Sequence, residues 1–239
     1  MSAVGPFFRR PFFPQGNWLQ VAATAVQDEL RTIFARWGLP AAVRVDNGGP
    51  WGSVGDWPPD LALWLLGLGL DVYWNDPHAP EQNGIVERSQ GTGKRWAEPG
   101  QCATPEELQQ RLQEMDAIQR ETYPSIDGQS RASAFPGLAH SGRPYRRSWE
   151  RTHWDHGRVL RHLAEYAAPR RVDKNGDVSL YHRPHYVGSK HRGKVVYVMV
   201  DPRRVEWVFA DAHGQQLRAQ PADELQAARI QSLTVSNRR

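Results

Sequence analysis

Residues 41–77 read AAVRVDNGGPWGSVGDWPPDLALWLLGLGLDVYWNDP, and this stretch decides the fold class. Residues 41–45 are apolar enough to predict a short buried strand. Residues 47–57 contain four glycines and one proline, which predict a loop. Residues 58–69 begin with prolines and continue apolar, which predicts a buried helix, and residues 70–74 predict a second strand. Alternating strands and helices with short connections are typical of an α/β layer.

Amphipathic helices are expected on both sides of this stretch. Residues 17–38 carry apolar side chains at three- and four-residue steps, with Asn17 as the N-cap and Gly38 as the stop. After a polar loop, another helix is expected to begin near Ile85. The residues at 104–107, Thr-Pro-Glu-Glu, form a capping box with proline at the first helical position, so a third helix should start there.

The C-terminal part of the chain has a different pattern. Residues 125–147 are rich in Gly, Ser, Pro and Arg and predict a linker, and residues 155–166 predict a short helix. From Arg170 onward, five short β-type runs follow one another at a spacing of about ten residues, which favours a small β-barrel. The runs are residue 172 and residues 178–181, 186–187, 195–200 and 205–209.

Charge is distributed unevenly along the chain. The net charge is +4, but residues 1–142 hold 11 basic and 16 acidic residues, whereas residues 143–239 hold 19 basic and 10 acidic ones. This asymmetry indicates an acidic part joined to a part that binds a polyanion. The single cysteine, Cys102, excludes a disulfide framework and a cysteine-based zinc site. No apolar run reaches the length of about 18 residues that a membrane helix needs, so a cytoplasmic protein is expected.

Two acidic residues stand out by their context. Asp46 follows the first predicted strand directly, and Glu87 lies in the first turn of the helix expected near Ile85. Ligand sites in open α/β sheets lie at the carboxyl ends of strands, so both side chains can converge at one sheet edge. Paired carboxylates suit Mg²⁺, a hard cation that takes oxygen ligands. The alternative is that Asp46 caps a turn and Glu87 complements a helix N-terminus.

Two sequence motifs follow one another in the chain: VDNGGPWGS at residues 45–53 and HAPEQNGIVERSQGTGKRW at residues 78–96. Together they resemble the integrase core of DDE-type transposases and retroviral integrases. The resemblance covers roughly residues 17–225 and implies an RNase H-like core, with Asp46 and Glu87 as catalytic residues and metal ligands. It further implies Mg²⁺ or Mn²⁺ as the cofactor, with two ions in an intact family member. The β-rich segment is similar to the small barrel that follows the core in many bacterial insertion-sequence transposases.

The expected fold class is therefore α/β: a partial RNase H-like core with a mixed sheet and flanking helices, followed by a small C-terminal β-barrel. The core is expected over residues 1–124 and a basic linker with a short helix over residues 125–168. The barrel is expected over residues 169–225 and a polar, basic tail over residues 226–239.

The chain departs from the family pattern at the carboxylates. Forty residues separate Asp46 from Glu87, more than is usual in the family, and Glu81 is a rival that lies outside the motif position. The first aspartate of the family lies on a strand before the amphipathic helix, yet no acidic residue precedes Asp28 here. We therefore expect an N-terminally truncated core that lacks its first catalytic aspartate and does not catalyse strand transfer as written.

Basic residues supply the candidate DNA contacts. Lys94 lies seven residues after Glu87 and so shares its helix face, and the resemblance implies that such a lysine contacts the DNA end. Arg95 lies on another face of the same helix and is a further candidate. The linker and the start of the barrel add five arginines that suit phosphate contacts, although a solvated basic surface would have the same composition. These are Arg143, Arg146, Arg147, Arg170 and Arg171.

The resemblance implies metal-dependent phosphoryl transfer for DNA integration and transposition, with element ends and target DNA as partners. It also implies a homo-oligomer in an intact family member and a bacterial location at the nucleoid when DNA is bound. One alternative is a non-catalytic fragment that binds element ends or co-assembles with full-length transposase. A hydrolytic nuclease with the same core is a third possibility, which the long basic linker and barrel disfavour.

Overall fold

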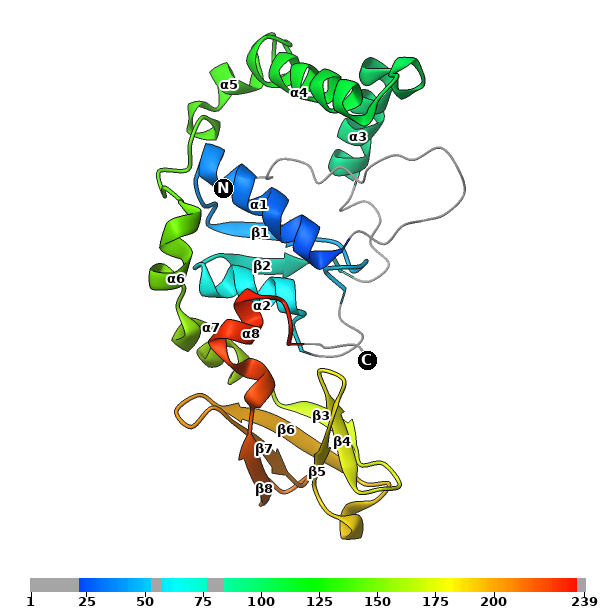
Figure 1. The fold of residues 1–239 in the computed structure, drawn as a ribbon, viewed down its shortest axis with the longest axis vertical. Coiled ribbons are helices and arrows are strands. Elements are labelled where there is room, and N and C mark those ends of the chain that lie inside the picture. Colours follow the sequence, from blue (N-terminus) through cyan, green and yellow to red (C-terminus); the bar gives the residue numbers. More distant parts are fainter. Residues whose placement is uncertain (1–21, 53–56, 77–83, 236–239) are drawn as a thin grey trace. The chain divides into compact units, whose positions relative to one another are not determined.

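The structure is a computed structural model that describes residues 22–52, 57–76 and 84–235, and it is a mixed α/β protein (Figure 1). The chain forms two compact units. The first unit includes Asp28–Asp46 and Tyr73–Arg147, and the second includes Asn47–Val72 and Ser148–Arg239. The N-terminal turn of the first helix belongs to the second unit. Within the described residues, no helix is both long and apolar enough to cross a bilayer.

The predicted strand–helix–strand order is confirmed. β1 (Ala42–Val45), α2 (Asp60–Gly67) and β2 (Asp71–Trp74) follow one another, and the two strands pair in a sheet. The amide of Asn75, just after β2, donates to the carbonyl of Val45 at 3.0 Å, so both strands end at the same edge, as in a parallel pair. All eight residues of α2 are buried, including Asp60 at its start, and the apolar run that follows Asp60 predicts this burial.

The first helix stops where the sequence predicts. α1 (Ala23–Trp37) is followed by Gly38 at φ +75°, whose amide donates to the carbonyl of Phe34 at 2.8 Å. A Cβ at residue 38 would lie 2.3 Å from Ser141 Oγ and 2.7 Å from the carbonyl oxygen of Arg143, so this position requires glycine. The expected N-cap at residue 17 lies outside the described residues.

The remaining helices of the first unit form a layer in which α3 (Gly84–Ala97) packs on α4 (Pro105–Glu121) and α4 packs on α5 (Arg131–Ala134). The capping box is present: Thr104 Oγ1 accepts from the amide of Glu107 at 3.2 Å. The Glu107 carboxylate accepts from the amide of Ala103 at 2.8 Å, one residue before the usual position. A short 3₁₀ turn, η2 (Pro99–Gln101), connects α3 to α4, and another, η3 (Pro136–Leu138), follows α5.

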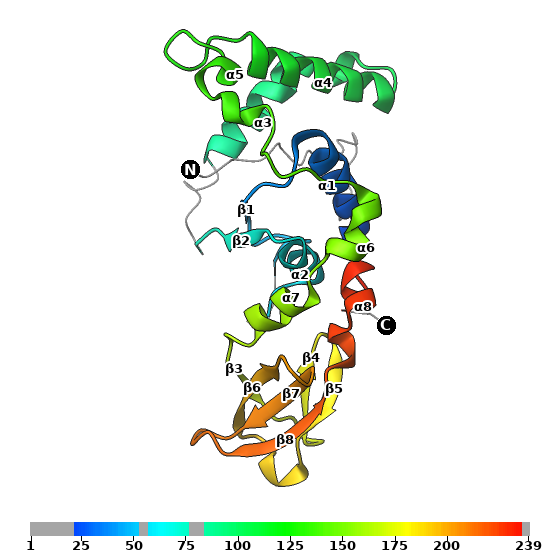
Figure 2. The same ribbon diagram turned by 90° about the vertical axis from the view of Figure 1, so that its left-hand side faces the viewer.

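In the second unit, α2 packs on α7 (His156–Leu163) and α8 (Ala227–Gln231) (Figure 2). η4 (Arg147–Trp149) leads into α6 (Glu150–His153). Glu150, the first residue of α6, is buried. The indole Nε1 of Trp64 donates to Glu150 Oε1 at 2.8 Å, and Trp154 Nε1 donates to the carbonyl of Trp64 at 3.0 Å. The predicted short helix is α7, and Asp155 caps it by accepting from the amide of Arg158.

The C-terminal strands form two sheets rather than one (Figure 1). β3 (Ala168–Arg171), β6 (Val195–Asp201), β7 (Glu206–Ala210) and β8 (Gln216–Pro221) form an antiparallel sheet in the order β3-β6-β7-β8. β4 (Asp177–Leu180) and β5 (Arg183–Tyr186) form a separate hairpin, which η5 (Ser189–His191) follows. No backbone ladder joins β5 to β8 within the described residues. A single side-chain bond links them, from Gln220 Nε2 to the carbonyl of Tyr186 at 2.8 Å.

Strand alternation determines which side chains of the four-stranded sheet are buried. Val198 on β6 pairs directly with Phe209 on β7, and both are fully buried. Tyr197, one residue earlier than Val198, points to the opposite face and is 37% exposed. The sheet therefore packs one face against the interior of its unit and turns the other toward solvent.

Candidate functional site

Asp46 lies where the sequence predicts a catalytic carboxylate. It follows β1 directly and its side chain is exposed. Because β1 and β2 end at the same edge, Asp46 stands at the carboxyl edge of this two-stranded sheet. β1 is four residues long, and its last residue, Val45, is buried and directly precedes Asp46.

Glu87 lies in the first turn of α3, as expected. The structure describes its backbone, and the orientation of its side chain lies outside the described structure, as does the whole of the rival Glu81. α3 packs mainly on α4, and neither strand of the small sheet is among its main neighbours. Asp46 and Glu87 belong to the same compact unit.

The described residues alone do not supply a full donor set for a metal ion. Within the described residues, no group of three or more His, Cys, Asp or Glu side chains could hold a metal. Asp28, the first acidic residue of the sequence, is engaged within the protein: its Oδ1 accepts from Arg31 at 3.0 Å and lies 3.2 Å from Arg147. The described residues therefore do not fit a complete two-metal site, and no catalytic step follows from them.

The residues of the first unit that are predicted to contact DNA are exposed, but some of them also bind other groups of the protein. Lys94 and Arg95 lie in the last turn of α3, and both are exposed. Arg143 donates from Nη1 to the carbonyl of Pro40 at 2.8 Å, whereas Arg147 forms an ion pair with Asp28. The remaining candidate of this unit, Arg146, is also exposed. The charge of Arg147 is thus partly neutralised within the protein.

Arg170 and Arg171 lie on β3, an edge strand of the C-terminal sheet. Because successive side chains alternate across a strand, these two arginines point to opposite faces. Arg170 is half-buried and its Nη1 donates to the carbonyl of Pro169 at 2.9 Å. Arg171 is exposed and is the better candidate of the two for an external contact.

A buried polar cluster in the second unit was not predicted from the sequence. Glu224, in η6 (Asp223–Leu225), is 1% exposed. Its Oε1 lies 2.8 Å from His185 Nε2 on β5 and accepts from Trp207 Nε1 on β7 at 2.9 Å. Burial alone would raise the pKa of Glu224, but its interactions with His185, with its own backbone amide and with Trp207 together outweigh burial and hold this pKa below its usual value.

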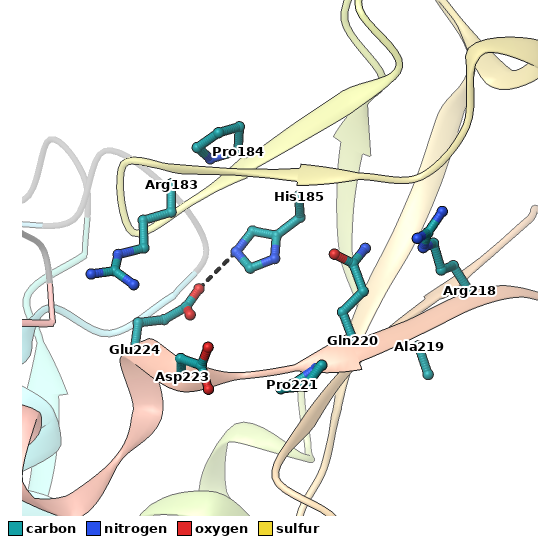
Figure 3. A pocket seen from close by; sticks show the side chains of 9 residues that line it. All are labelled: Arg183, Pro184, His185, Arg218, Ala219, Gln220, Pro221, Asp223 and Glu224. Atoms are coloured by element: carbon teal, nitrogen blue, oxygen red, sulfur yellow. Dashed lines mark hydrogen bonds and ion pairs between the residues drawn. The ribbon is translucent and has the colours of Figure 1, made fainter.

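This cluster forms one wall of a hollow of about 510 Å³ between β5 and β8 (Figure 3). His185 and Glu224 point toward each other, and Arg183 and Arg218 lie at the two ends of the hollow, with Gln220 between them. No sequence motif marks this site, because its residues come from segments that are far apart in the chain. The chain as a whole matches no family model.

Proposed function

We propose that this chain is a DDE-type transposase or integrase with an RNase H-like core and a C-terminal barrel. In an intact member of that class, carboxylate-held Mg²⁺ or Mn²⁺, two ions in all, assists phosphoryl transfer to DNA. The observation that carries the proposal is the exposed Asp46 at the carboxyl end of β1. It is followed in order by a buried helix, a paired strand and a helix that carries Glu87 in its first turn.

We further propose that the chain as written binds DNA without catalysing strand transfer. The family resemblance assigns two carboxylates, Asp46 and Glu87, and Asp28 is engaged by Arg31 and Arg147. The basic half of the chain supports DNA binding, because exposed arginines at positions 143, 146 and 171 suit contacts with phosphates. The partners that we propose are the element ends, or a full-length transposase with which the chain assembles.

A strand-transfer assay tests the catalytic part of this proposal. With a labelled linear duplex, a supercoiled plasmid target and Mg²⁺ or Mn²⁺, we expect no joined product, and the wild type should match Glu87→Gln. Joined product that disappears in Glu87→Gln would contradict this expectation.

Binding of Mn²⁺, followed by the electron paramagnetic resonance signal of the free ion, tests the role of Asp46 independently of activity. Loss of bound Mn²⁺ in Asp46→Asn supports that role, and equal binding by both proteins overturns it.

A further inference from the structure

Tyr186, the last residue of β5, is open to solvent although several contacts hold its ring and backbone. Its side chain is 44% exposed. A Cβ built at Gly176 would lie 2.9 Å from Cε2 of Tyr186, so the ring packs directly on the backbone of that glycine. The guanidinium carbon of Arg218 lies 5.4 Å from the centroid of the same ring. The carbonyl of Tyr186 accepts from Gln220 Nε2 at 2.8 Å, which fixes the backbone as well.

The groups around the hydroxyl of Tyr186 favour its ionised form. The backbone amide of Ser189 donates to Oη of Tyr186 at 3.2 Å. The hydrogen bonds from the backbone and the side chain of Ser189 lower the pKa of Tyr186 most. The positive charges of Arg192 and Arg218 lower this pKa further, and together these interactions outweigh desolvation. Negative charge on this phenolic oxygen is therefore stabilised before any reagent arrives.

Two other tyrosines are more exposed and provide a comparison within the same chain. The side chain of Tyr73 is 55% exposed and that of Tyr123 is 47% exposed. The ring of Tyr123 packs edge-on against Trp96, with the two centroids 5.3 Å apart. Among the described residues, no backbone amide donates to the hydroxyl of either tyrosine, whereas the hydroxyl of Tyr186 has such a donor. Exposure and activation of the hydroxyl can thus be separated by experiment.

A phenolate is a stronger nucleophile than a phenol, and stabilising the ionised form is one way in which proteins activate a nucleophile. We propose that Tyr186 is a modification site that takes acyl groups from activated acyl donors at its phenolic oxygen. Oη attacks the acyl carbon, the bond from that carbon to its leaving group breaks, and the phenolic proton passes to the leaving group or to water. The product is a tyrosine ester. This site lies beyond the proposed function, because neither DNA nor Asp46 takes part in the step.

The test treats the full chain with limiting N-acetylimidazole near neutral pH and measures the acetylation rate of each tyrosine by mass spectrometry of its peptides. Release of the acetyl group by neutral hydroxylamine distinguishes tyrosine esters from acetylated lysines. We expect Tyr186 to be acetylated about threefold faster than Tyr73 or Tyr123, although both of these are more exposed.

Variants of the neighbouring residues connect this rate to the contacts of Tyr186. The double variant Arg192→Gln/Arg218→Gln should slow acetylation of Tyr186 about threefold, to the rate of Tyr123. Ser189→Pro should also slow it, because proline lacks the N–H that donates to Oη. Arg203→Gln is the matched control, because Arg203 is exposed in the same unit but is not one of the arginines that shift the pKa of Tyr186. We expect Arg203→Gln to react as the wild type does.

The rates of Tyr73 and Tyr123 in each variant report whether the protein is still folded, so a local effect is recognised by a change at Tyr186 alone. The proposal is supported if Tyr186 reacts fastest in the wild type and loses this advantage in the double variant. It is overturned if Tyr186 reacts no faster than Tyr73 and Tyr123. It is also overturned if Tyr186 keeps its advantage in both the double variant and Ser189→Pro.

Discussion

Replacing Glu224 with alanine should destabilise the second unit by about 3 kcal/mol, because the substitution leaves two buried N–H groups without an acceptor. These are Nε2 of His185 and Nε1 of Trp207, which both contact Oε1 of Glu224 in the wild type. Trp207 is fully buried, so water cannot replace the lost carboxylate. Hydrogen exchange of the β7 amides, measured by mass spectrometry, should accelerate about a hundredfold if these amides exchange by opening of the unit.

The effect should be confined to the second unit, so exchange in α4 should remain at the wild-type rate. Glu206→Ala is the matched control, because Glu206 lies on the same strand as Trp207 but is half-exposed, and it should cost less than about 1 kcal/mol. Because the pKa of Glu224 is lowered in the folded protein, its contribution should be complete above the ordinary value of 4.5 and decline as the pH falls below it. Wild-type exchange rates in Glu224→Ala would contradict the role given to this carboxylate.

Replacing Gly67 with alanine should also destabilise the second unit by about 3 kcal/mol, although alanine usually stabilises a helix relative to glycine. A Cβ at Gly67 would lie 2.0 Å from Cε2 of Trp154 and 2.1 Å from its Nε1. The indole of Trp154 is buried and donates to the carbonyl of Trp64, so it cannot move without losing that hydrogen bond. Thermal unfolding followed by circular dichroism should show the loss.

Gly91→Ala is the matched control for this substitution. Gly91 also lies inside a helix, α3, but beyond the local helix backbone no atom of the described residues comes within 4 Å of a Cβ built there. We expect Gly91→Ala to stabilise the protein by up to about 1 kcal/mol. In a double-mutant cycle, Gly67→Ala should cost almost nothing once Trp154 is replaced by alanine. A Gly67→Ala variant as stable as the wild type would contradict the close packing described for this helix.

The local elements were predictable from the sequence because local signals determine them. The apolar run of α2, the glycine after α1 and the threonine that caps α4 each act within a few residues. β8 was missed because it is a half-exposed edge strand whose sequence, QLRAQP, lacks β-branched and aromatic residues. The turn between β4 and β5 was missed for a similar reason. Tyr181 and His182 both adopt positive φ there, at 45° and 64°, without glycine or asparagine to signal it.

Long-range features could not be predicted from the sequence. The two sequence motifs identified Asp46 and Glu87 as candidate catalytic residues, and Asp46 lies at a strand end as expected. The hollow that Arg183 and Arg218 line exists only because β5 and β8 come together, and the motif search contained no signal for that pairing. Likewise, the bond between His185 and Glu224 spans 39 residues of sequence. Such contacts depend on tertiary packing, which periodicity and composition do not encode.

The most direct test of the account is DNA binding by the full chain, followed by the anisotropy of a labelled duplex between about 50 and 200 mM salt. The account predicts clear binding at the lower salt concentration and a steep decline, with a slope of about −3 or steeper on logarithmic axes, because several arginines contact phosphates. It is contradicted if the chain shows no binding at low salt, or if binding is insensitive to salt over this range.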